Sequence, residues 1–76
     1  MRGFINITLD RTSSSKPTTI IKRIQNVDHV KFAHLVTGKI DAIAFVDAPD
    51  SDAFRDSILA ISSINGVLST VTNVAL

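Results

Sequence analysis

Cysteine is absent from this 76-residue chain, and so are tryptophan and tyrosine. Without cysteine the protein can form neither a disulfide nor a thiolate metal site. Only His29 and His34 could bind zinc through nitrogen, and no cluster of further His, Asp or Glu ligands accompanies them. The sequence therefore predicts no metal and no other cofactor.

Neither sign of charge dominates the chain. Eight basic and seven acidic residues give a formal net charge of +1. A protein that binds nucleic acid through its own surface usually carries a clear basic excess. We therefore expect no direct contact with DNA.

Long hydrophobic runs are also missing. No apolar segment approaches the roughly 20 residues that a membrane-spanning helix needs. The first residues, Met-Arg-Gly-Phe-Ile-Asn, lack the hydrophobic region of a signal peptide. Together with the absence of cysteine, this predicts a soluble, cytoplasmic protein that makes no membrane contact.

Apolar residues are nevertheless abundant, at 45% of the chain. A domain of this size buries only about 60% of the surface that its unfolded chain exposes. Small domains gain stability from disulfides, metals or oligomerisation. Since the first two are not expected here, the composition favours a homo-oligomer.

The spacing of apolar residues predicts a mixed fold. Ile5, Ile7 and Leu9 alternate, which is typical of a strand, whereas Ile20 and Ile24 recur at helical spacing. Similar patterns elsewhere give the predicted element order, which is strand 4–9, helix 16–28, strand 30–36, strand 41–47, helix 51–64 and strand 67–76.

Turn and cap residues separate these elements. Pro17 fits the first turn of a helix, and Ser15 is its expected N-cap. Asp50 or Ser51 is the expected N-cap of the second helix, and Gly66 suits the left-handed position that follows a helix. The third strand is apolar at nearly every position, which favours burial of both its faces.

A weak internal repeat supports the same order. Shifting the sequence by 37 residues aligns four identical pairs, which are Asp10 with Asp47, Ile21 with Ile58, Ile24 with Ile61 and Val30 with Val67. We expect an α+β, ferredoxin-like βαββαβ fold, with two helices on one face of a four-stranded antiparallel sheet. A second copy would cover the bare, apolar face of the sheet. Leu59, on the outer side of the second helix, is a further candidate for a subunit contact.

The segment Val36-Thr-Gly-Lys-Ile-Asp41, between two strands, is the most informative stretch. A turn built on Gly38 presents backbone N–H groups to an anion, and Asp41 presents a carboxylate to a cation. A free amino acid carries both charges. The alternative is a plain hairpin in which Asp41 only forms the turn.

Residues 30–47 and 64–76 resemble the C-terminal effector-binding module of the Lrp/AsnC (feast/famine) transcription regulators. That family carries a V-x-G-x-x-D hairpin and a P-G-V-x-x-T-x-T segment. Their counterparts here are Val36 to Asp41, and Asn65-Gly66-Val67 with Thr70 and Thr72. The resemblance covers essentially the whole chain, so residues 1–76 are identified as a single RAM (regulation of amino acid metabolism) domain.

The resemblance implies a sheet-to-sheet dimer (a dimeric α/β barrel) that assembles into a ring of eight or ten chains. Amino acids or similar small effectors would bind between dimers. Asp41 would pair with the effector ammonium, and threonines of another dimer would add hydroxyl contacts. The implied ligand-binding residues are Thr37, Gly38, Lys39, Asp41, Thr70 and Thr72.

Three features depart from the family pattern. Ile40 stands where an aromatic residue is common, and Asn65 stands where proline is usual. No room for a helix-turn-helix precedes the first strand, so a stand-alone domain is expected. Such a domain could act on transcription by associating with full-length Lrp/AsnC regulators.

Two other functions remain open at this point. Dimeric ferredoxin-like barrels include enzymes, and His34, Asp41 and Asp47 are the only acid–base candidates here. Because His34 has no evident carboxylate partner, we expect no enzymatic activity. A purely structural oligomer is the other alternative.

Overall fold

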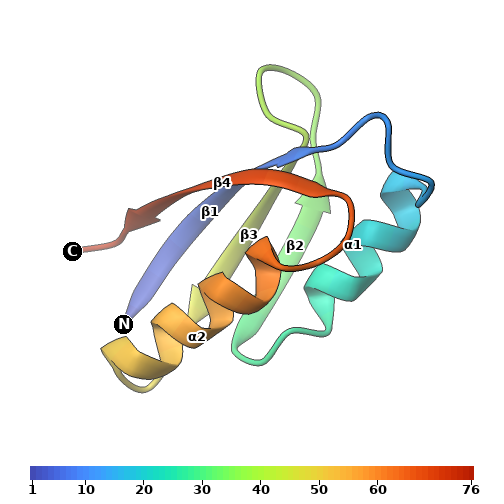
Figure 1. The fold of residues 1–76 in the computed structure, drawn as a ribbon. Coiled ribbons are helices and arrows are strands. Elements are labelled where there is room, and N and C mark those ends of the chain that lie inside the picture. Colours follow the sequence, from blue (N-terminus) through green and yellow to red (C-terminus); the bar gives the residue numbers. More distant parts are fainter.

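The computed structural model describes residues 1–76 and has six elements in the predicted order (Figure 1). They are β1 (Arg2–Leu9), α1 (Pro17–Gln25), β2 (Val30–Leu35), β3 (Ala42–Asp47), α2 (Ser51–Ser62) and β4 (Val67–Val74). The strands form one sheet in the order β2-β3-β1-β4, and every neighbouring pair is antiparallel. Both helices lie on the same side of this sheet (Figure 1). The α+β, ferredoxin-like βαββαβ fold is confirmed.

The core lies between the helices and the sheet. Alternate residues of β1 (Ile5, Ile7 and Leu9) are buried, as their spacing predicts. Ile20 and Ile24 of α1 pack against them in a cluster of 13 buried hydrophobic residues. Burial of one such side chain contributes roughly 1.5–3 kcal/mol, so this layer is a main source of stabilisation.

The ends of α1 differ from the prediction. Lys16, not Ser15, occupies the N-cap position, and no side chain caps the helix. The Ser15 N–H instead donates to the Ser13 hydroxyl at 3.2 Å. The helix ends at Gln25, about one turn earlier than predicted, with Asn26 as its C-cap, and a turn with a positive φ of 70° at His29 follows before β2.

The start of α2 agrees with the prediction. The Asp50 carboxylate accepts a hydrogen bond from the Ala53 N–H at 2.8 Å, which is an N-cap. Buried Ser57 donates to the Asp28 carbonyl at 2.7 Å and so fastens α2 to the turn after α1. Neither helix is long and apolar enough to cross a membrane.

The internal repeat reappears as two matching turns. Asn26 and Ser63, 37 residues apart, cap their helices with φ of −89° and ψ of −2° and −4°. In both turns the first strand residue donates its N–H to the carbonyl three residues earlier, at 3.2 and 3.0 Å. The left-handed position is His29 in the first turn and Gly66, with φ of 105°, in the second. The two halves therefore fold alike from helix end to strand start.

The expectation that β3 is buried on both faces is wrong for the single chain. Ala42, Ala44 and Val46 are fully buried beneath the helices, whereas Ile43 and Phe45 are only half-buried. The reason is that both helices cover one face of the sheet and nothing in the chain covers the other. We call this second side the open face.

Candidate ligand-binding site

The predicted hairpin joins β2 to β3. The Val36 N–H donates to the Asp41 carbonyl at 3.0 Å, which closes the turn. Gly38 has a φ of 130°, and a Cβ there would meet no atom within 4 Å. Gly38 is therefore required by backbone conformation and not by packing.

Thr37, Gly38 and Lys39 are exposed at the tip of this turn. None of their backbone N–H groups donates a hydrogen bond within the chain. Exposed, unpaired N–H groups in a turn can bind an anion. The turn therefore offers the donor groups that an anionic ligand needs.

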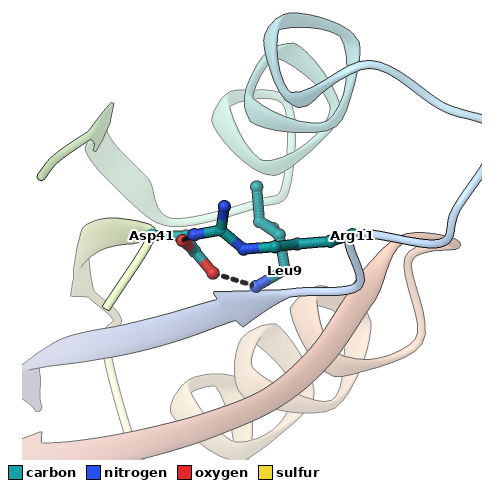
Figure 2. Close-up of polar contacts among 3 residues, drawn as sticks. All are labelled: Leu9, Arg11 and Asp41. Carbon is teal, nitrogen blue, oxygen red and sulfur yellow. Dashed lines mark hydrogen bonds and ion pairs between the residues drawn. The ribbon is translucent and has the colours of Figure 1, made fainter. Parts of the chain in front are cut away.

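Asp41 lies at the base of the hairpin, and its carboxylate is turned toward the end of β1 (Figure 2). Oδ2 accepts the Leu9 N–H at 2.8 Å, and Oδ1 accepts Nη2 of Arg11 at 3.0 Å. The Asp41 side chain is 20% exposed, whereas that of Arg11 is 85% exposed. Asp41 is thus a carboxylate held by the backbone, with one oxygen paired to an exposed cation.

An open cavity of about 540 Å³ surrounds this ion pair. It lies between the segment after β1, the first turn of α1 and the end of β2. Small-molecule sites in proteins are typically of this size, roughly 300–1,000 Å³. Its lining residues are Leu9, Asp10, Arg11, Ser13, Ser14, Ser15, Lys16, Pro17, Ile20, Leu35, Val36 and Asp41.

The second carboxylate of the cavity, Asp10, already has partners of its own. The Thr12 hydroxyl and the Thr12 N–H donate to Oδ1 at 2.6 and 2.9 Å. These bonds, that of the hydroxyl first, lower the pKa of Asp10 below its ordinary value. Asp10 therefore stays ionised at neutral pH while it orders the loop that carries Arg11.

The two predicted threonines lie elsewhere in the chain. Thr70 pairs with Ile7 and Thr72 with Ile5, so both belong to β4, and both are half-buried. β1 separates β4 from β3, which places the two strands about 10 Å apart. Of the six predicted ligand-binding residues, Asp41 alone lines the cavity, and Thr37, Gly38 and Lys39 lie outside its lining on the turn between Val36 and Asp41.

Sequence reasoning missed Arg11 as a partner of Asp41. The two residues are 30 positions apart, and only the antiparallel register of β1 and β3 brings them together. That register pairs Ile7 with Ala42, so the residues just beyond Ile7 face those just before Ala42. A basic residue just after the first predicted strand and an acidic one at the start of the third is the signal that could have indicated the pair.

The open face carries a row of aromatic rings. Phe4 lies 4.9 Å from Phe45, Phe45 lies 5.5 Å from Phe32, and Phe32 stacks on His34 at 5.4 Å, measured between ring centroids. Phe4 is 40% exposed and Phe32 is 39% exposed. Clustered exposed aromatic rings of this kind mark an interaction surface.

These features define a ferredoxin-like domain with an open aromatic sheet face and a hairpin beside a small cavity. The family model described as the Lrp/AsnC ligand binding domain matches residues 2–76. The chain therefore belongs to the Lrp/AsnC ligand-binding family, whose members are domains of transcription regulators.

Solved structures agree with this assignment. TTHA0845 from Thermus thermophilus is 25% identical, with a TM-score of 0.85, and the match covers 99% of this chain and 91% of that one. Escherichia coli AsnC is also 25% identical, with a TM-score of 0.83, and the match covers 99% of this chain and 50% of AsnC.

The transcriptional regulator NMB0573 from Neisseria meningitidis, solved as an L-Met complex, is 18% identical with a TM-score of 0.82. The match covers 99% of this chain and 49% of that one. This chain thus spans about half the length of these two regulators and most of the Thermus protein. A search of curated protein sequences gave no match.

Proposed function

We propose that this protein binds a small effector, an amino acid or a similar molecule, and acts on transcription as a homo-oligomer without contacting DNA itself. The observation that carries this proposal is the hairpin, which combines unpaired N–H groups at its tip with the Asp41 carboxylate at its base in a domain of the Lrp/AsnC ligand-binding family. The near-neutral charge of these 76 residues supports the part concerning DNA.

The proposed effector contacts follow from the two charges of an amino acid. Backbone N–H groups of Thr37, Gly38 and Lys39 bind the carboxylate, and Asp41 binds the ammonium. A charge-assisted hydrogen bond of this second kind is among the stronger polar contacts in proteins. The L-Met complex of the Neisseria regulator supports the ligand class.

Thr70 and Thr72 enter this site from another copy. Within one chain β4 is two strands away from β3, so these hydroxyls reach a hairpin only across a subunit contact. A site divided between subunits lets the ligand change the assembly, because binding energy then depends on the contact. This is the proposed route from effector to regulation.

The open face supports dimerisation through the sheet. Three phenylalanine rings in contact form an apolar surface that a second sheet covers by face-to-face packing. We propose that such dimers form a ring of eight or ten chains in the cytoplasm. Full-length Lrp/AsnC regulators are the proposed protein partners, since they carry a domain of the same fold.

The enzyme alternative has less support. His34 stacks on Phe32 of the open face, and Asp47 lies at the other end of β3 from Asp41, about 20 Å away. An acid–base mechanism needs its groups within hydrogen-bond reach of one substrate. Asp41 and Asp47 do not converge on one substrate, and His34 stacks on a ring of the open face, so we propose a binding function and no catalysis.

Thermal unfolding in the presence of each of the 20 common amino acids tests the proposal. A ligand at about 100 times its dissociation constant adds about 2.7 kcal/mol to the free energy of unfolding, which raises the melting temperature measurably. We expect one or a few amino acids to do so, and Asp41→Asn to remove the effect.

Asp41→Asn is preferred to Asp41→Ala because an amide oxygen can still accept the Leu9 N–H. Its melting temperature without ligand should remain near that of the wild type. A wild type that responds to none of the amino acids, or an Asp41→Asn variant that responds as the wild type does, would contradict the proposal.

A further inference from the structure

We propose that Arg11 is a ligand-binding residue of this site: it leaves Asp41 when the effector ammonium arrives and binds the effector carboxylate. The ligand class is then a free amino acid that is recognised through both of its charges. This inference rests on the proposed function, since it takes Asp41 as the ammonium partner.

The hydrogen bonds of Asp41 place Arg11 at the oxygen where an effector ammonium would bind. Oδ2 accepts the Leu9 N–H at 2.8 Å, a backbone bond that fixes the side chain, so the partner that an incoming cation can replace is the one at Oδ1. Nη2 of Arg11 donates a hydrogen bond to Oδ1 at 3.0 Å (Figure 2). An ammonium group that binds Asp41 at Oδ1 meets the guanidinium and displaces it or shares the oxygen with it.

The exposure of Arg11 makes this displacement inexpensive. An ion pair with a partner that is 85% exposed is screened by water and contributes little to stability. The displaced guanidinium stays on its loop at the edge of the cavity. Asp41 has a cation beside it both before and after binding, because the effector ammonium takes the place of the Arg11 guanidinium.

The displaced Arg11 lies beside the effector carboxylate. In an amino acid the carboxylate and the ammonium are attached to the same carbon, so a group bound at Oδ1 carries its carboxylate next to the guanidinium. The planar guanidinium matches a carboxylate with two parallel N–H donors. Among the lining residues the other cation is Lys16, at the first turn of α1.

Arg11 and the hairpin can serve the same carboxylate. The cavity reaches Val36 and Asp41, the two residues at the ends of the turn, and the unpaired N–H groups of Thr37, Gly38 and Lys39 lie on the turn between them. One carboxylate oxygen then faces the guanidinium and the other faces the hairpin. One ion pair within the protein is thereby exchanged for two between protein and ligand.

Binding affinities of a matched probe series test Arg11. The probes are the amino acid that raises the melting temperature most in the panel, its carboxamide and its decarboxylated amine. We expect the wild type to bind the amino acid best, because both analogues lack the carboxylate. Arg11→Gln should weaken amino acid binding about 10- to 100-fold and leave carboxamide binding within about twofold.

Arg23→Gln is the matched control, because Arg23 is an exposed arginine in the last turn of α1 and does not line the cavity. Its affinity for all three probes should equal that of the wild type. Arg11→Gln should keep the melting temperature of the unliganded protein, since its side chain lies in solvent.

The other outcomes separate this inference from the proposed function. If Arg11→Gln binds the amino acid as tightly as the wild type does, or more tightly, Arg11 merely competes for Asp41 and the inference alone fails. If it loses the amino acid and the carboxamide equally, Arg11 has only a structural role, which also overturns the inference. A wild type that binds no amino acid overturns both.

Discussion

At the scale of single residues, His29 and Gly66 occupy the same place in two matching turns, yet only one of them is glycine. Both have a positive φ, of 70° and 105°. A left-handed conformation costs a non-glycine residue roughly 1–2 kcal/mol. The first turn therefore holds backbone strain that the second avoids, and the two positions should respond oppositely to substitution.

Gly66→Ala should lower the free energy of unfolding by about 2–4 kcal/mol, because two effects add. The left-handed backbone disfavours alanine, and a Cβ at this position would press on the Ile20 side chain, with Cγ1 3.0 Å away. Gly38→Ala is the control, since it shares the positive φ but has open space around it. Urea denaturation should show that Gly38→Ala lowers the free energy of unfolding by only about 1 kcal/mol. Equal losses of stability in the two variants would contradict this account.

His29→Gly should raise the free energy of unfolding by up to about 1 kcal/mol. The gain is the backbone strain that glycine relieves, less the roughly 0.5–1 kcal/mol of extra chain entropy that glycine has when unfolded. The hydrogen bond from the Asp47 N–H to the carbonyl of residue 29, at 3.0 Å, does not depend on the side chain. Asn26→Gly is the control, because Asn26 has an ordinary φ of −89° and gains no relief. A loss of stability in His29→Gly would show that its side chain matters more than its backbone.

At the scale of elements, the two helices begin differently. Asp50 caps α2 through its carboxylate, whereas Lys16 stands at the N-cap of α1 and offers no acceptor. Lys16 has φ of −73° and ψ of 148°, the extended geometry of an ordinary N-cap. The first turn of α1 is therefore built for a cap that its sequence does not supply.

Lys16→Ser should raise the free energy of unfolding by about 1 kcal/mol, since a hydroxyl there can accept an N–H of the first turn. Asp50→Ala should lower it by about the same amount, because the bond to the Ala53 N–H at 2.8 Å is lost. Guanidinium denaturation measures both. No gain in Lys16→Ser, with the expected loss in Asp50→Ala, would show that the first turn of α1 is already satisfied in solution.

The same comparison shows which elements a sequence can predict. The order of all six elements follows from apolar spacing, because burial of one face requires that spacing. The ends of α1 do not follow, since Ser13 accepts the N–H of the expected cap Ser15, and at the other end Asn26 caps the helix before the turn at His29. Propensity rules describe average caps and cannot foresee these local competitors.

The site was predictable to the extent that it is local. The Gly38 turn and the position of Asp41 follow from six consecutive residues. The Arg11 partner and the cavity depend on strand register and on how the loop after β1 folds, which no local pattern records. The placement of Thr70 and Thr72 came from family resemblance, and their role stays a prediction.

At the scale of the whole molecule, helices cover only one face of the sheet. The helices bury Ala42, Ala44 and Val46 of β3, and the alternate residues of the same strand face outward beside Phe4 and Phe32. A second sheet packed on this face would give β3 the burial on both sides that its apolar sequence predicts. The chemistry of β3 is thus that of a central strand in a two-layer assembly.

Phe32→Asp should therefore dissociate the protein. A charge on the open face would have to be buried without a partner in a sheet-to-sheet dimer, whereas in the monomer it stays in water because Phe32 is 39% exposed. Light scattering coupled to size exclusion should give a mass that is a multiple of 8.2 kDa for the wild type and 8.2 kDa for the variant.

Leu59→Asp, on the outer side of α2 and 58% exposed, is the matched control. It introduces the same charge away from the open face and should leave the dimer intact, while a fall in mass from a ring to a dimer would place Leu59 between dimers. A Phe32→Asp variant that is folded by circular dichroism and keeps the wild-type mass would mean that the open face is covered by something other than a second copy.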